Sequence, residues 1–137
     1  MGLGVGYEDE KRFADAQKAF ERALQADPKY ADAEYQLGIL ISLNGNSVQA
    51  MEHFEHAVQI NPNHALALAK VGNLYLQSGQ FEKAREALLK AESLDPNNRE
   101  TEYGLAQAYG KLGNHEEAKI HMDRFQKGKG ATNERKQ

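Results

Sequence analysis

Histidine is the residue of this chain whose side chain most directly suggests chemistry, and the five histidines are His53, His56, His64, His115 and His121. His53 and His56 lie three residues apart, which places them on one face of a helix, close enough to share a metal ion. Their sequence, HFEH, is not the HExxH of zinc enzymes, and nothing in the sequence forces a carboxylate onto the pair. We therefore interpret these histidines as exposed residues of helix surfaces and predict no metal site.

The other reactive residue types form no catalytic group either. The serines fall at expected turns or helix ends without a matched base: Ser42, Ser47, Ser78 and Ser93. Cysteine is absent, which excludes thiolate nucleophiles, disulfides and Cys-based zinc sites. The glycines form no loop that would cradle a phosphate. The sequence predicts a protein that is not an enzyme and that needs no cofactor.

Composition and charge narrow the classes of partner. The chain has 137 residues, of which 40 % are hydrophobic and 27 % charged, as in a folded domain. A nucleic-acid-binding protein usually has a broad basic surface, and the net charge of −3 gives no indication of one. No apolar run approaches the length of a membrane-spanning helix, and no secretory signal begins the chain. We expect a protein or peptide partner, neither nucleic acid nor membrane, and a cytoplasmic location.

Three similar sequence stretches occur at a constant interval. LQADPKYADAEYQLG, VQINPNHALALAKVG and ESLDPNNRETEYGLA begin at Leu24, Val58 and Glu92, each 34 residues after the last. Aligning the chain on these stretches gives six columns: Leu3, Leu37, Val71 and Leu105; Gly4, Gly38, Gly72 and Ala106; Tyr7, Ile41, Tyr75 and Tyr109; Ala16, Ala50, Ala84 and Ala118; Phe20, Phe54, Leu88 and Met122; Ala23, Ala57, Ala91 and Phe125. A period of this length indicates stacked structural repeats.

The spacing inside one repeat is typical of two helices. Leu37, Gly38 and Ile41 share one face of a helix, and the second stripe of apolar residues, beginning at Ala50, has the same period. Turn signals separate the stripes: Asn44 to Ser47, Ser78-Gly79 and Gly113-Asn114. A proline then ends each second helix, at positions 28, 62 and 96. We expect about eight helices in antiparallel pairs, with Gly38 and Gly72 buried where two helices meet.

These columns resemble the tetratricopeptide repeat family. The family pattern L-G-x-x-Y, A-x-x-x-F-x-x-A, P is matched through about residue 127, although the family's tryptophan is replaced by Glu34, Leu68 and Glu102. The resemblance implies an all-α fold, a right-handed α-solenoid of about four stacked helix-turn-helix hairpins, with the first repeat incomplete. The expected repeats are about 1–30, 31–64, 65–98 and 99–127, in a domain of residues 1–127 that a flexible basic tail at 128–137 follows.

The resemblance also implies where a partner binds. In this family the first helix of each repeat lines a concave groove that holds peptides. The matching positions here are Tyr35, Gln36, Ile39, Lys70, Asn73, Gln77, Tyr103, Gln107 and Lys111. Amide side chains can bond an extended peptide backbone, and tyrosines suit an anchoring role. A basic clamp for a C-terminal carboxylate, which some family members use, needs a groove arginine that this chain lacks.

The ends of the chain suggest an alternative, self-association. The first helix is expected to be short by most of a turn, as if the chain were cut there, leaving the face around Phe13 and Phe20 thinly covered. At the other end, which has the features of a true terminus, Phe125 stands in a column of alanines and Ile120 in a column of charged residues.

Three functions remain open on this reading. A non-enzymatic interaction scaffold that binds a peptide in the groove is the main prediction. A structural module that forms homo-oligomers through Phe13, Phe20, Ile120 and Phe125 is the alternative, and an enzyme with a substrate site in the groove is the third.

Overall fold

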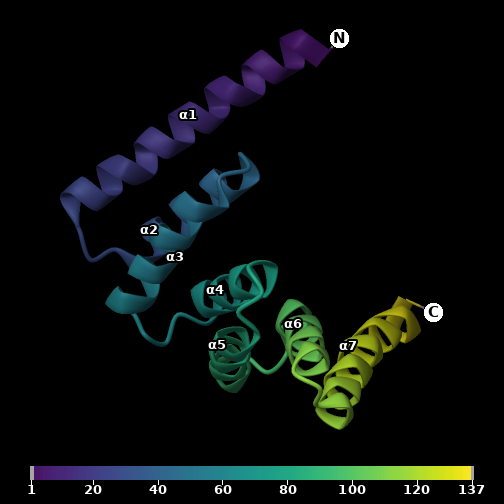
Figure 1. The fold of residues 1–137 in the computed structure, drawn as a ribbon. Helices are drawn as coiled ribbons and strands as arrows, with labels where there is room; N and C mark the ends of the chain where they lie inside the picture. The colour runs from purple at the N-terminus through teal and green to yellow at the C-terminus, as the bar shows by residue number, and fades with distance from the viewer. Residues whose placement is uncertain (1, 137) are drawn as a thin grey trace. The chain divides into compact units, whose positions relative to one another are not determined.

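The computed structural model describes residues 2–136, and the side chains of residues 10–127. The described residues form seven helices and no strand, which confirms the all-α prediction (Figure 1). The helices are α1 (Gly2–Ala26), α2 (Ala31–Leu43), α3 (Ser47–Ile60), α4 (Ala65–Gln77), α5 (Phe81–Leu94), α6 (Arg99–Lys111) and α7 (His115–Lys136). The chain divides into two compact units, Met1–Pro62 and Asn63–Gln137, so α1 to α3 belong to the first unit and α4 to α7 to the second.

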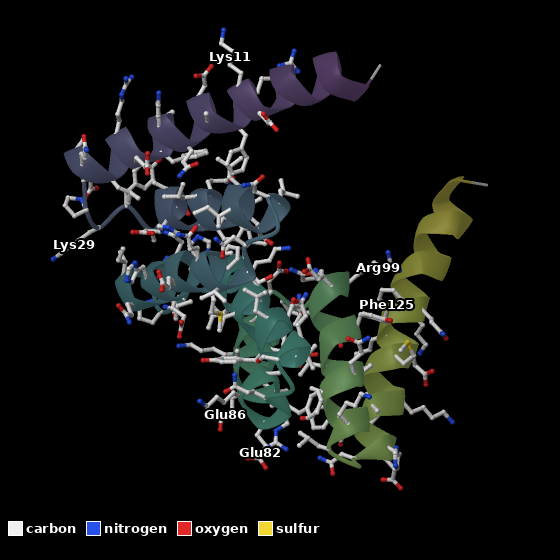
Figure 2. All side chains as sticks on the ribbon, turned by 45° about the horizontal axis from the view of Figure 1, so that its top comes forward. Lys11, Lys29, Glu82, Glu86, Arg99 and Phe125 are labelled. Carbon is white, nitrogen blue, oxygen red and sulfur yellow. The ribbon has the colours of Figure 1, made fainter. Side chains whose placement is uncertain are left out.

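The first repeat is one continuous helix, not the two helices that the sequence predicted. Three turns elsewhere depend on a glycine with positive φ: Gly45 at 87°, Gly79 at 80° and Gly113 at 86°. The same column of the first repeat holds Lys11, which extends from the middle of α1 (Figure 2). Because a residue with a β-carbon is strained in the left-handed region, the chain does not turn at Lys11 and the helix continues. The side chains of Leu3, Gly4 and Tyr7 lie outside the described residues.

The other helix boundaries follow the signals in the sequence. The side chain of Asn46 accepts a hydrogen bond from Gln49 N at 3.1 Å and so caps α3. Asn98 caps α6 in the same way, accepting from Thr101 N at 3.3 Å. Helices α1, α3 and α5 end just before the dipeptides Asp27-Pro28, Asn61-Pro62 and Asp95-Pro96, as expected of prolines.

Two glycines allow the paired helices to approach closely, as the sequence predicted. A β-carbon added to Gly38 on α2 would lie 2.7 Å from the Phe54 ring on α3. One added to Gly72 on α4 would lie 2.5 Å from Leu88 Cγ on α5. Both glycines are buried, and Phe54 and Leu88 are among the largest completely buried side chains. In the α2–α3 and α4–α5 hairpins, a bulky side chain therefore packs directly against the backbone of a glycine.

The second unit has its core where α6 meets the α4–α5 hairpin. Buried Ala84, Leu88, Leu105 and Ala108 form this core, with Tyr75, Leu76 and Tyr109 packed against it. Gly104 on α6 is a further close contact, since a β-carbon there would lie 2.8 Å from Asn73 Oδ1 and 3.0 Å from Leu88 Cδ1. This packing fixes α4 and α6, which carry most of the predicted groove residues, against each other.

A buried polar cluster holds α5, α6 and α7 together. His121 Nδ1 lies 2.6 Å from Glu102 Oε2 and 3.3 Å from Glu92 Oε2, and the side chains of His121 and Glu102 are only 4 % and 7 % exposed. Arg124 Nη1 binds Glu92 Oε2 at 3.2 Å. The pKa of Glu92 is raised above its ordinary 4.5, first because burial removes water from its carboxylate and then through the hydrogen bond and charge of Glu102; His121 and Arg124 act in the opposite direction.

Helix α7 continues through Lys136, so its backbone is helical where the sequence predicted a flexible tail after residue 127. No proline follows the last repeat to end the helix, unlike the stops at Pro28, Pro62 and Pro96. The side chains of the predicted tail, 128–137, lie outside the described residues.

The glycine contact predicts a difference between two equal substitutions in the second unit. Gly72→Ala adds a methyl group against Leu88 and should lower the free energy of unfolding by about 1–3 kcal/mol. Gly110→Ala adds the same group where the nearest neighbour is Ala118 Cβ at 4.0 Å, and should raise it by about 0.5–1 kcal/mol. Urea denaturation followed by circular dichroism measures both. Equal effects of the two variants would contradict the assigned packing.

The raised pKa of Glu92 predicts a pH-dependent effect of Glu92→Gln. A carboxyl group with a raised pKa contributes stability that is present near pH 4.5 and is lost as the pH rises through the folded-state value. Glutamine stays neutral, so the melting temperature of the variant minus that of the parent should increase from pH 4.5 to neutral pH. Glu82→Gln, an exposed change on α5, controls for the loss of one charge. A difference that shrinks as the pH rises would show that the ionised form of Glu92 is the favoured one.

Candidate functional site

The predicted groove residues lie on the first helix of each hairpin, namely α2 in the first unit and α4 and α6 in the second. On α2, Gln36 is exposed and Ile39 half-buried. Tyr35 is only 9 % exposed, and its ring packs on Phe54 with the centroids 5.8 Å apart. Tyr35 therefore contributes to the hairpin interior, and we do not carry it into the proposal as an anchor.

Gln36 lines a hollow of the first unit. The hollow has a volume of about 400 Å³ and is formed by α1, α2 and the turn between them. Its lining residues are Ala19, Phe20, Ala23, Tyr30, Asp32, Ala33 and Gln36. Phe20, which the sequence assigned to a self-association surface, thus lies in the same hollow as a groove residue.

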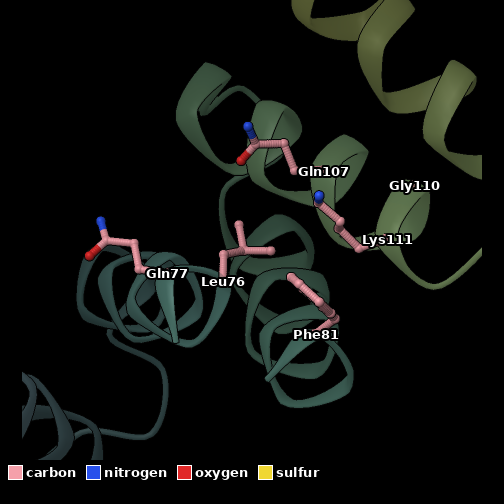
Figure 3. A pocket seen from close by; sticks show the side chains of 6 residues that line it. All are labelled: Leu76, Gln77, Phe81, Gln107, Gly110 and Lys111. Atoms are coloured by element: carbon pink, nitrogen blue, oxygen red, sulfur yellow. The ribbon is translucent and has the colours of Figure 1, made fainter. Parts of the chain in front are cut away.

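Three predicted groove residues of the second unit come together around an open cavity of about 500 Å³. Gln77 comes from the end of α4, and Gln107 and Lys111 come from α6 (Figure 3). Leu76 and Phe81 supply the apolar part of the wall, and Gly110 leaves space beside them. The cavity therefore offers two amides and one ammonium group beside an apolar surface, with no obvious catalytic group in its lining.

The other two groove residues of α4 are already engaged with α6. Glu100 Oε1 accepts hydrogen bonds from Lys70 Nζ at 3.1 Å and from Asn73 Nδ2 at 2.7 Å. The charge of Lys70 is therefore compensated within the second unit. This pairing places Lys70 and Asn73 as a bridge between helices, whereas Lys111 forms no ion pair with any side chain that the structure describes.

Tyr103 lies on the side of α6 that faces α7. Its ring lies against that of Phe125, with the centroids 5.1 Å apart and the ring planes tilted by 44°. The Arg99 guanidinium lies over the Phe125 ring, 4.4 Å from its centroid (Figure 2). Arg99 Nε also donates to the backbone oxygen of Phe125 at 3.4 Å. Phe125 thus packs on α6 within its own chain. Ile120, by contrast, is 43 % exposed.

The sequence interpretation placed histidines on exposed helix surfaces without carboxylate partners. His56 and His115 are exposed as expected, whereas His53, His64 and His121 are not. His121 is buried beside two glutamates, and His64 is buried as the N-cap of α4, its Nδ1 accepting from Ala67 N at 3.1 Å. His53 is bound to Glu34 at 2.7 Å. Among the described residues, two groups have ligand atoms all within 4.8 Å of one another: Glu34, His53 and His56, and Glu92, Glu102 and His121. The sequence signal that was missed is the 19-residue interval between glutamate and histidine, which joins the two helices of one hairpin.

Across residues 2–136, no helix combines the length and the apolar character that crossing a membrane requires.

Solved structures with a similar fold include several of MamA. The crystal structure of MamA matches with a TM-score of 0.75 and 23 % identity, covering 91 % of this chain and 73 % of that one. A second, the crystal structure of MamA protein, matches with a TM-score of 0.73 and 25 % identity, covering 98 % and 73 %. The MamA RS-1 ArsTM double mutant has a TM-score of 0.74 and 23 % identity, with 95 % and 73 % covered. No curated protein matches this chain.

Family models cover nearly the whole chain. Three models described as tetratricopeptide repeat match residues 2–65, 53–86 and 103–127, and one described as TPR repeat matches residues 72–113. The matches overlap, the sequence columns recur every 34 residues, and the helical hairpins follow the same interval. The chain belongs to the tetratricopeptide repeat family.

Proposed function

We propose that this protein is a non-enzymatic interaction scaffold that binds an extended peptide segment of a partner protein along the first helices of its hairpins. Membership of the tetratricopeptide repeat family supports the general role. The observation that carries the finer proposal is the open cavity of the second unit, where Gln77, Gln107 and Lys111 surround an apolar wall.

The chemistry of this cavity suits a peptide. Each glutamine offers one acceptor and two donors, which can pair with the N–H and C=O groups of an extended backbone. Leu76 and Phe81 offer an apolar surface for one side chain of the peptide. Lys111, at the cavity edge, favours a ligand with an acidic residue next to an apolar one. The expected ligand is therefore a short extended segment with an apolar residue followed or preceded by Asp or Glu.

The contrast between Lys111 and Lys70 sharpens this expectation. Lys70 is held by Glu100, so using it for a ligand would first require breaking that pair. Lys111 needs no such exchange, and it shares the cavity with both glutamines. The binding energy for an acidic residue is thus assigned to Lys111 and not to Lys70.

A peptide selection tests the proposal. Peptides selected from a random display library against the parent chain should be enriched in an acidic residue beside an apolar one. Lys111→Glu should weaken binding of these peptides by about tenfold or more, as expected when an attractive charge becomes a repulsive one, and should leave the melting temperature unchanged. Fluorescence polarisation gives the affinities.

Two matched variants complete the test. Lys119→Glu makes the same charge reversal on the exposed face of α7, outside the cavity, and should leave binding unchanged. Phe54→Ala removes a buried ring from the first unit and should cost about 3–5 kcal/mol of stability. Selected peptides that bind Lys111→Glu and the parent equally would refute the assigned cavity.

Self-association is the second candidate function, and one observation favours it. Helix α1 packs on α2 as a single helix, and the Phe13 side chain on it is only half-buried. Ile120 is exposed on α7. A second copy of the chain would cover such apolar positions, as neighbouring repeats do inside a stacked array.

Light scattering after gel filtration, from micromolar to near-millimolar protein, tests this second function. The mass of the parent protein is expected to rise with concentration. The Phe13→Glu variant places a charge at the half-buried position, and its mass should stay at that of one chain. A parent that remains at one chain throughout the range would eliminate self-association as a function.

A further inference from the structure

Glu34 lies between two imidazoles of the neighbouring helix in the first unit. Glu34 is on α2, and His53 and His56 are on α3. Glu34 Oε2 lies 2.7 Å from His53 Nδ1, and Glu34 Oε1 lies 3.8 Å from His56 Nδ1. The two rings are nearly perpendicular, with their centroids 6.4 Å apart. One carboxylate and two ring nitrogens therefore converge on one point of the α2–α3 hairpin.

The same columns carry a glutamate–histidine pair in the last hairpin. Glu102 and His121 stand 68 residues, or two repeats, after Glu34 and His53, and their Oε2–Nδ1 distance is 2.6 Å. The third repeat holds Leu68 and Ala87 at these positions. The pair thus bridges the two helices of a hairpin in two repeats, whereas the intervening repeat has two apolar residues in these columns.

The two clusters differ in the residue that completes them. The column of His56 holds Arg124 in the last hairpin, and Arg124 binds Glu92 at 3.2 Å. A guanidinium is permanently charged and donates only, so it cannot ligate a cation, whereas a neutral imidazole can. In the cluster around His121, Arg124 therefore supplies the positive charge and no further ligand. In the cluster around His53, the same column supplies His56, which can bind a metal ion.

We propose that Glu34, His53 and His56 bind one divalent transition-metal ion, with Zn²⁺ as the expected ion. Tetrahedral zinc with bonds of roughly 2.0–2.1 Å separates neighbouring ligand atoms by about 3.3–3.4 Å. One ligand atom from each of Glu34, His53 and His56 already lies within 4.8 Å of the other two, so the three need to close by about 1.5 Å at most to reach this spacing. Two imidazoles and one carboxylate form a donor set that Zn²⁺ accepts.

The exposure of the cluster leaves room for the rest of the coordination shell. The His56 side chain is 56 % exposed and that of His53 is 26 % exposed, so solvent reaches the ligand atoms and can fill a fourth position. Glu34 is 12 % exposed, which fixes the carboxylate against the hairpin while the metal enters from the His56 side. Because the ligands come from both α2 and α3, the bound ion would join the two helices and stabilise the folded hairpin.

Titration of the full untagged chain with ZnCl₂ tests the site. Isothermal titration calorimetry should show one saturable equivalent, and the melting temperature should rise as zinc is added. His56→Arg copies the residue of the last hairpin at an exposed position. It should weaken zinc binding by at least about tenfold, because loss of even a residue that only supports a ligand typically lowers metal affinity by that factor. It should also abolish the rise in melting temperature.

Further variants make every outcome decisive. Glu34→Gln, a second ligand change, should weaken binding in the same way, and His115→Gln, which removes an exposed histidine of the second unit, should leave it unchanged. Unaltered melting of His56→Arg without zinc confirms that it folds. The proposal is overturned if the parent binds no equivalent of zinc, if His56→Arg binds as the parent does, or if only His121→Gln loses the ion.

Discussion

The close approach of paired helices at Gly38 and Gly72 is the constraint on which the two middle hairpins depend. There is no space for a β-carbon at either position, because the ring of Phe54 and the end of Leu88 already occupy it. This narrow column sets how closely the two helices approach, and other buried side chains of the first helix, such as Tyr35 on Phe54, pack beside it. Outside this column, α4 contributes Gln77 and α6 contributes Gln107 and Lys111 to the lining of one cavity. The proposed binding residues are therefore different residues of these helices from the glycines at the close contacts.

Most of the helices could be predicted from the sequence because their signals are local. Apolar period, turn glycines, asparagine caps and prolines act within a few residues, and α2 to α6 follow them. The first repeat shows where this reasoning fails. The apolar columns there suggested two helices, but the turn between two helices needs a residue that tolerates positive φ, and Lys11 is not such a residue. Backbone sterics at one position outweighed the agreement of all the apolar columns.

The candidate site was predictable only in part, because its details are contacts between distant residues. Gln77, Gln107 and Lys111, which the repeat pattern placed on one face, line one cavity, since a fixed interval places equivalent positions on neighbouring helices. It did not show that Glu100 holds Lys70 and Asn73, or that the Tyr35 ring turns onto Phe54. Those outcomes depend on side-chain rotamers and on the separation between helices, which no spacing rule contains. The Glu34–His53 contact belongs to the same class, although its recurrence at Glu102 and His121 was visible in the alignment once the interval was known.

The continuous helix α1 shows that the number of sequence repeats and the number of helical hairpins can differ. The chain contains four copies of the sequence period, but residues 2–136 fold into three hairpins and one long helix. Within these residues, the three copies that keep a glycine at the turn form hairpins, and the copy that holds Lys11 there forms a single helix. In a repeat protein of this kind, a point mutation at the turn column is therefore expected to change the number of hairpins without gain or loss of a repeat. For this chain, the number of sequence copies and the number of hairpins are therefore different, and the residue at the turn column accounts for the difference.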